Sequence, residues 1–291
     1  SHCGNVARCT YLTNEAKELA LTRTLPAGIH VREFGQPVGA PTLLLIHGRS
    51  EDGSVWPDAV RRWADTYRMI APDMRGHGES DRFTADELAG DPMRQMYEDC
   101  VAILAYASAD SAEPVVVVGH SMGAGLAADL AAWEPRYLRA AVLEEPTWYP
   151  TINWDERRQQ AQEMIASAAM ARTDIQSVIS EYQVNNPHWP DGEAERSAYA
   201  KSRMDDAFIA TGKGFVKEPG EDIASAISIP TLMVSGTTGN FQQPSWDAIE
   251  NLHNPNIAIE VLDGASHSVR RDMSEQYHAV VDPWIAQQFT K

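Results

Sequence analysis

The residue with the clearest chemical potential in this sequence of 291 residues is a serine between two glycines. Ser121 stands in Gly119-His120-Ser121-Met122-Gly123, directly after four valines and before an alanine-rich segment. A buried strand that runs into a helix is the context in which a G-x-S-x-G serine projects its hydroxyl above a sheet. We therefore predict that Ser121 is a nucleophile, with a purely structural turn as the alternative. The Met122 N–H, at the start of the helix, is predicted to stabilise an oxyanion.

A serine hydroxyl is a weak nucleophile unless a base lies beside it, so one of the nine histidines should face Ser121. His267 follows the apolar run Ile257–Leu262, at the end of a strand where Ser121 also emerges. We predict that His267 is the base. His47, His77 and His120 stand in glycine-flanked loops and are expected to pack around the site.

Apolar runs alternate with helical patterns along the chain, which is typical of a parallel sheet covered by helices on both faces. Strands are predicted at Leu19–Leu25, Ile29–Phe34, Thr42–Ile46, Arg68–Ala71, Val115–Val118, Ala140–Leu143, Thr231–Val234 and Ile257–Leu262. Helices are predicted between them at Val55–Asp65, Met93–Ala107, Met122–Trp133, Trp246–Leu252 and Glu275–Phe289.

The rhythm of strand and helix breaks between about Pro146 and Gly220, where the patterns are helical and no convincing strand occurs. The helices predicted there are Asp155–Ala171, Thr173–Val184 and Glu193–Thr211. The sequence therefore predicts an α/β core over residues 1–145 and 221–291. A helical cap, residues 146–220, is inserted after the sixth strand.

Four segments resemble, in order, the α/β-hydrolase superfamily in its cap-bearing form, over about residues 18–290. They are the oxyanion loop Leu45-Ile46-His47-Gly48-Arg49, the D-x-R-G-x-G-x-S loop Asp73–Ser80, the serine turn and the histidine loop Asp263–Ser268. The resemblance implies an α/β-hydrolase fold with a mostly parallel, eight-stranded sheet. It also implies that the Arg49 N–H joins the Met122 N–H in an oxyanion hole. Asp73 and Arg75 are expected to be structural.

The acid that orients the histidine departs from the superfamily's common pattern. In most members it follows the seventh strand, but here Ser235–Phe241 contains no carboxylate. Some members, including certain haloalkane dehalogenases and lactone hydrolases, carry the acid after the sixth strand. Alignment on that strand places Glu145 at the acid position, and Glu144 and Asp247 remain alternatives.

The substrate pocket is expected where the chain leaves the sheet for the cap. Trp148 and Trp154 lie there, and an aromatic lid would favour a hydrophobic or aromatic substrate and exclude water. The Arg49 side chain has two interpretations. It is solvated or paired with Glu51 or Asp52, or it points into the pocket and favours a polar or anionic group.

These features together predict a serine hydrolase that cleaves a carboxylic ester or a lactone through an acyl-enzyme on Ser121, without a cofactor. The same fold also serves C–C bond hydrolases and cofactor-free dioxygenases of heteroaromatic rings. In the dioxygenases the histidine is the essential base and the serine is secondary. A ligand sensor without catalytic activity is the third alternative.

Composition limits the partners. The 41 acidic against 24 basic residues give a net charge of −17, so nucleic acid and anionic membranes are unsuitable partners. No apolar run approaches the roughly 20 residues of a membrane helix. Three cysteines and no signal peptide favour a cytoplasmic protein with a small-molecule substrate. Metal-ligand spacing and a G-x-G-x-x-G fingerprint are both missing, and no oligomeric state is predicted.

Overall fold

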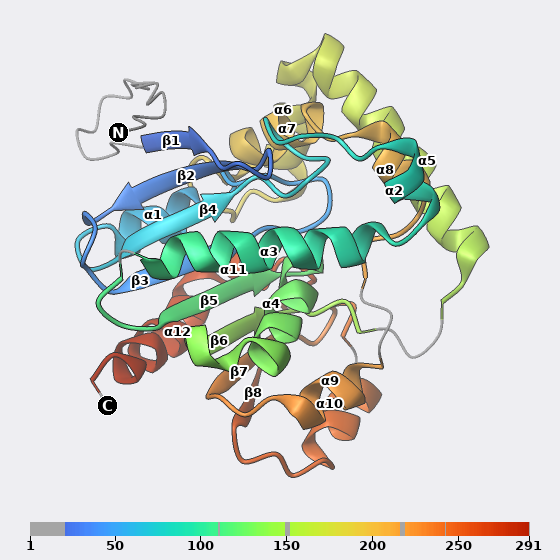
Figure 1. The fold of residues 1–291 in the computed structure, drawn as a ribbon. Helices are drawn as coiled ribbons and strands as arrows, with labels where there is room; N and C mark the ends of the chain where they lie inside the picture. Colours follow the sequence, from blue (N-terminus) through green and yellow to red (C-terminus); the bar gives the residue numbers. More distant parts are fainter. Residues whose placement is uncertain (1–20, 110, 149–151, 216–218, 242, 291) are drawn as a thin grey trace, which may run out of the picture.

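A single eight-stranded sheet carries the site. The computed structural model describes residues 21–290 except 110, 149–151, 216–218 and 242 (Figure 1). Residues 19–20 of the first predicted strand, and Cys3 and Cys9, lie outside the described residues. The strands are β1 (Leu21–Thr24), β2 (His30–Gly35), β3 (Thr42–Ile46), β4 (Arg68–Pro72), β5 (Val115–His120), β6 (Leu138–Glu144), β7 (Thr231–Gly236) and β8 (Ile257–Leu262).

The strand order is β1-β2-β4-β3-β5-β6-β7-β8. The pairs β1–β2 and β2–β4 are antiparallel, and the remaining pairs are parallel. Parallel neighbours need crossover connections, which explains why helices separate the strands along the chain. The predicted α/β-hydrolase fold is confirmed, with a mostly parallel sheet and helices on its two faces.

Successive side chains of the central strands pack against different helical layers, because they alternate between the faces of the sheet. Val115 and Val117 belong to one apolar cluster, and Val116 and Val118 to the other. The first cluster lies under α3 (Pro92–Ala109), α4 (Met122–Trp133), α9 (Gly220–Ala226) and α10 (Gln243–Glu250). The second lies under α1 (Pro57–Trp63) and α12 (Ser274–Gln288), which Figure 1 shows behind the sheet.

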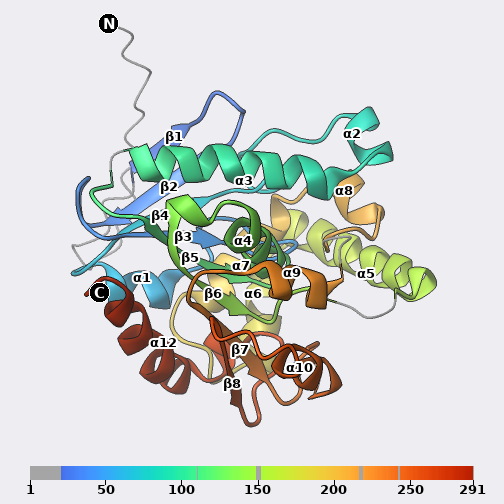
Figure 2. The ribbon, with the colours of Figure 1, turned by 60° about the horizontal axis from the view of Figure 1, so that its bottom comes forward.

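The helical insertion lies between β6 and β7, as predicted. Its described helices are α5 (Trp154–Thr173), α6 (Ile175–Asn185), α7 (Glu193–Ser202) and α8 (Asp206–Ala210). A small apolar cluster, Ala171, Val178, Ile179 and Ala198, joins α5, α6 and α7. Figures 1 and 2 show α5 lying away from the sheet at the edge of the molecule. The single helix predicted for 193–211 is wrong, because Asp205 starts a new helix by accepting the Ala207 N–H.

The central strands continue past their predicted ends and thereby position the site. His120 of β5 pairs with Glu144 of β6 in the parallel register. Ser121 and Glu145 are the next residues along each chain, so they leave the same edge of the sheet side by side. Four short helices of the described residues were not predicted, namely α2 (Ala85–Ala89), η1 (Pro135–Tyr137), α9 and α11 (Val269–Asp272).

Candidate active site

Ser121 sits on a strained turn between β5 and α4. Its φ of 54° and ψ of −116° are unusual for a residue with a side chain. A Cβ on Gly119 would lie 2.3 Å from the Gly123 carbonyl oxygen, and a Cβ on Gly123 would lie 2.1 Å from that of Ile46. Both flanking glycines are therefore required for the close approach of α4 to β5 and β3. The turn lifts the Ser121 side chain out of the plane of the sheet.

The structure brings Ser121, His267 and Glu145 into one line of hydrogen bonds. The distance from Ser121 Oγ to His267 Nε2 is 2.8 Å, and the distance from His267 Nδ1 to Glu145 Oε2 is 3.2 Å. The carboxylate accepts a hydrogen bond from the Nδ1–H group, which leaves the Nε2 lone pair directed at the serine hydroxyl. This arrangement can remove the hydroxyl proton as the oxygen attacks an electrophile.

The loop after β7 holds the acid that the superfamily pattern usually places in that loop. The buried Glu145 side chain accepts hydrogen bonds from the N–H groups of Gly236 at 3.0 Å, Asn240 at 2.7 Å and Phe241 at 3.0 Å. Three N–H donors satisfy a carboxylate that has no access to water. The segment Ser235–Phe241, which lacks a carboxylate, thus forms a socket for the carboxylate of Glu145, the residue that follows β6.

The two alternative acids lie elsewhere. Glu144 Oε1 accepts the Arg270 N–H at 2.8 Å, and its main-chain carbonyl accepts the Ser121 N–H at 2.9 Å. Asp247 is exposed on α10. Of the three candidates, the structure brings Glu145 to His267.

The two residues predicted to donate to an oxyanion both lie near the serine. Met122 is the first residue of α4, so its N–H has no acceptor in a preceding helical turn. Arg49 lies in the loop after β3 and lines the same cavity as Ser121. N–H groups that point at a tetrahedral oxyanion stabilise it, so the oxyanion hole of Arg49 and Met122 stays a prediction.

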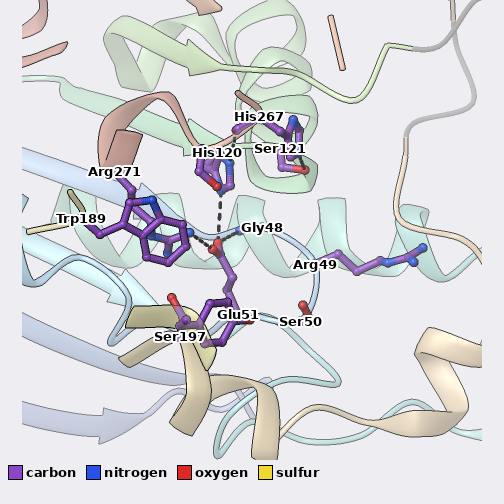
Figure 3. Close-up of a pocket in the computed structure, with 12 residues that line it drawn as sticks. Gly48, Arg49, Ser50, Glu51, His120, Ser121, Trp189, Ser197, His267 and Arg271 are labelled. Atoms are coloured by element: carbon purple, nitrogen blue, oxygen red, sulfur yellow. Dashed lines mark hydrogen bonds and ion pairs between the residues drawn. The ribbon is translucent and has the colours of Figure 1, made fainter. Parts of the chain in front are cut away.

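The Arg49 side chain reaches the helical insertion, and Glu51 and Asp52 pair with other residues. Its guanidinium donates to the carbonyl oxygens of Gly212 at 3.2 Å and Lys213 at 2.9 Å, and Figure 3 shows it extending away from Ser121. Glu51 pairs with Arg271 instead, and Asp52 pairs with Arg203. The Arg49 side chain therefore ties the oxyanion loop to the cap.

A cavity of about 190 Å³ lies over the serine (Figure 3). Its floor comes from the core and its roof from the helical insertion. The lining residues are Gly48, Arg49, Ser50, Glu51, His120, Ser121, Tyr182, Trp189, Ser197, His267, Ser268 and Arg271. Most of these side chains are polar or charged, so the cavity suits a small molecule that carries hydrogen-bonding groups.

The structure does not bring Trp148 or Trp154 into this cavity. Trp148 is buried against Phe241, with ring centroids 6.1 Å apart. Trp154 is 42% exposed at the start of α5. Neither indole is among the side chains that line the cavity.

The aromatic side chains that do line the cavity come from farther along the insertion. Tyr182 of α6 and Trp189 of the following loop stack with ring centroids 5.8 Å apart. Trp189 also donates its indole N–H to Asp272 at 2.9 Å. In the sequence Trp189 stands in a segment rich in proline and asparagine, residues 185–192, and this composition does not say where the loop docks.

Other histidines and acids near the site form hydrogen bonds that hold its loops in place. The His47 Nε2 atom accepts the Met74 N–H at 2.9 Å, and burial lowers the pKa of His77 to about 3. Asp73 accepts the Gly53 and Glu79 N–H groups, as expected for a structural loop.

Among the described residues, no group of three or more His, Cys, Asp or Glu side chains is arranged to hold a metal ion. The described helices include none with the length and apolarity needed to cross a bilayer.

Known proteins are similar to this chain over most of its length. A 2-(acetamidomethylene)succinate hydrolase from Mesorhizobium japonicum is 26% identical over 254 residues, which cover 83% of this chain and 85% of that protein. The dihydrolipoyllysine-residue acetyltransferase component of the acetoin cleaving system from Cupriavidus necator is 35% identical over 122 residues, or 42% of this chain. The chain matches 31% of the length of that relative.

Solved structures share the fold. The crystal structure of E-2-(acetamidomethylene)succinate hydrolase has a TM-score of 0.70 at 21% identity, covering 92% of this chain and 99% of that one. A putative aryl esterase from Burkholderia cenocepacia has a TM-score of 0.69 at 20% identity, covering 94% and 100%. The model of the alpha/beta hydrolase family matches residues 43–282. Since that match takes in most of the chain, this protein belongs to the alpha/beta hydrolase family.

Proposed function

We propose that this protein is a serine hydrolase that cleaves a small carboxylic ester or lactone through an acyl-enzyme. The observation that carries the proposal is the 2.8 Å contact between Ser121 Oγ and His267 Nε2, with Glu145 on the far side of the imidazole. A hydroxyl, an imidazole and a carboxylate in this order form the arrangement that activates serine in acyl transfer.

The chemistry proceeds in two halves. Ser121 Oγ attacks the carbonyl carbon while His267 Nε2 takes the hydroxyl proton. The tetrahedral adduct then collapses, the bond to the alcohol oxygen breaks, and His267 returns its proton to that oxygen. Water, activated by the same nitrogen, attacks the acyl-enzyme and releases the acid. In a lactone the alcohol and the acid leave as one hydroxy acid.

Two other groups support these steps. Glu145 holds the Nδ1–H tautomer of His267 and stabilises the imidazolium that forms in each half. The N–H groups of Arg49 and Met122 donate to the oxyanion, a contribution of about 3 kcal/mol for one such donor in related chemistry.

The lining of the cavity supports a small substrate with polar groups. The cavity holds about 190 Å³, and the Tyr182–Trp189 pair gives it one flat aromatic wall. Ser197 Oγ and Arg271 Nη2 belong to lining residues and have no hydrogen-bond partner among the described residues. The name of the relative from Mesorhizobium japonicum specifies a substituted succinate, which is itself a small, carboxylate-bearing molecule.

The test is hydrolysis of p-nitrophenyl acetate and of a panel of small lactones, with wild type beside Ser121→Ala. We expect turnover by the wild type and a loss of at least roughly 10³-fold in the variant. Preference between linear and cyclic substrates would then separate esterase from lactonase activity.

Turnover that survives in Ser121→Ala would exclude the acyl-enzyme. A wild type without turnover on either substrate class would exclude the proposed specificity. Oxygen uptake with heteroaromatic rings, or cleavage of a diketone, would then identify the dioxygenase or C–C hydrolase alternative. Tight binding without turnover would identify the sensor.

A further inference from the structure

Both ring nitrogens of His120 face hydrogen-bond acceptors. His120 is the last residue of β5, directly before Ser121, and only 5% of it is exposed. Its Nε2 atom lies 2.9 Å from the main-chain carbonyl oxygen of His267. Its Nδ1 atom lies 3.2 Å from Glu51 Oε2, as the dashed line in Figure 3 marks.

Neither acceptor can act as a donor. A carbonyl oxygen has no proton to give. Glu51 Oε2 also accepts the Gly48 N–H at 2.7 Å, and Glu51 Oε1 accepts from Arg271 at 2.7 Å. Burial favours the neutral form of Glu51, but Arg271 and His120 outweigh it and hold the pKa of this carboxyl well below its usual value. Both contacts of His120 therefore require an N–H, and an imidazole has two only when it is protonated.

Charge balance in the surrounding cluster requires the same proton. Three buried carboxylates lie here, those of Glu51, Glu144 and Glu193. Arg270 pairs with Glu193 at 2.8 Å and lies 4.0 Å from Glu144, and Arg271 pairs with Glu51 and Glu193. Two guanidinium groups leave one negative charge unmatched. A buried unmatched charge is costly, and a third cation at His120 removes it.

We infer that His120 is held as an imidazolium, a fixed positive charge that opposes protonation of the neighbouring His267 and so acts against the Glu145 carboxylate at His267 Nδ1. The two rings are 5.2 Å apart between centroids. At that separation a positive charge opposes protonation of the second imidazole. The charge state of His120 stands on its own geometry, whereas the consequence for activity rests on the proposed hydrolase function.

The groups around His120 come from four elements, and some of them raise the pKa of its imidazole while others lower it. Burial and the Arg271 cation of α11 lower the pKa of His120. Glu144 of β6 and Glu51 of the loop after β3 raise it, and the net pKa lies above the ordinary value. The fourth neighbour is His267 itself, which contributes a carbonyl oxygen to Nε2. His120 is accordingly a positioning residue, since it holds the main chain of His267 without reaching the reacting atoms through its ring nitrogens.

The direct test is ¹⁵N NMR of the histidine-labelled protein at pH 7, with the His120 signals assigned by their loss in His120→Gln. Both ring nitrogens should show the shifts of a protonated imidazolium. In Glu51→Gln the cluster loses one carboxylate, and His120 should change to a neutral tautomer. A neutral pattern for His120 in the wild type would overturn the inference, whether or not the protein hydrolyses esters.

A second test measures the consequence for catalysis. The pH dependence of kcat/KM for p-nitrophenyl acetate is compared between wild type and His120→Gln. Loss of the positive charge should move the acid limb toward higher pH by roughly one unit. His253→Asn, at an exposed position in the loop between α10 and β8, is the control and should keep the wild-type profile. If the acid limb of His120→Gln coincides with that of the wild type, the proposed action on His267 is refuted.

Discussion

The Gly239 Cα faces the carboxylate of Glu145, and a Cβ at this position would lie 2.2 Å from Glu145 Oε1. The socket that holds the acid therefore has no room for a side chain. Gly236, Asn240 and Phe241 supply its three N–H donors, so the acid after β6 depends on the loop after β7.

Gly239→Ala should displace the Glu145 carboxylate from His267. We expect kcat for p-nitrophenyl acetate to fall at least about 10-fold, because a small misplacement of an orienting group is costly. Gly90→Ala is a suitable control, since a Cβ there has its nearest contact at 3.3 Å. Equal activity in the two variants would show that the socket does not set the position of the acid.

Glu145→Gln tests the acid itself. The amide cannot stabilise an imidazolium and can offer its N–H₂ to Nδ1, which selects the wrong tautomer. We expect kcat to fall about 10³- to 10⁴-fold, as for the amide variant of the corresponding acid in serine proteases. Asp247→Asn, on the exposed side of α10, should retain full activity in the same assay. The opposite ranking of the two variants would transfer the role to Asp247.

Glu193→Gln tests the attachment of the helical insertion to the core. Glu193 is the first residue of α7 and is fully buried, and its two oxygens accept from Arg270 at 2.8 Å and Arg271 at 2.9 Å. Removal of this charge leaves two buried cations short of a partner, which should lower the free energy of unfolding by about 3–5 kcal/mol. Denaturant titration at pH 7 measures the loss.

The matched control for that variant is Glu195→Gln. Glu195 lies two residues farther along α7 and accepts from the exposed Gln183 side chain. Its replacement should change the free energy of unfolding by less than about 0.5 kcal/mol. Similar losses in the two variants would mean that the buried pairs do not stabilise the docked insertion.

His77 predicts a pH dependence of stability. Burial, with His47 beside it, lowers the pKa of His77 to about 3, and the neutral ring donates from Nδ1 to the Arg75 carbonyl and accepts the Ser50 N–H at Nε2. The unfolded chain binds a proton below about pH 6.5, whereas the folded chain does not. The stability due to His77 is therefore present above pH 6.5 and is lost as the pH falls toward 3, by about 1.4 kcal/mol per unit.

Urea unfolding of wild type and His77→Gln at pH 7, 6, 5 and 4 measures this effect. The gap in unfolding free energy between the two proteins should narrow as the pH falls, since glutamine does not titrate. A gap that stays constant over this range would show that the folded protein protonates His77 as readily as the unfolded chain does.

The sequence by itself determined the sheet, the serine turn and the histidine loop. Each depends on residues that are close together along the chain. Four successive valines bury a strand on both faces, and the glycines beside Ser121 permit a turn that other residues would block. Likewise His267 could be predicted, because the ends of parallel strands meet at one edge of the sheet.

The choice between Glu144 and Glu145 needed the tertiary structure. Neighbouring residues at a strand end point to opposite faces of the sheet. The backbone conformation where the chain leaves β6 therefore determines which of the two carboxylates contacts the histidine. Here Glu144 turns to Arg270, while a φ of 53° at Glu145 brings its side chain under the loop after β7.

The roof of the cavity and the charge of His120 were also decided by tertiary contacts. Trp189, rather than Trp148 or Trp154, lies over the serine, because ion pairs and hydrogen bonds between the insertion and the core determine how the insertion docks. His120 is charged because Glu51 and the His267 carbonyl, 69 and 147 residues away along the chain, converge on its ring. Such partners meet only after the sheet has formed, so no local pattern in the sequence specifies them.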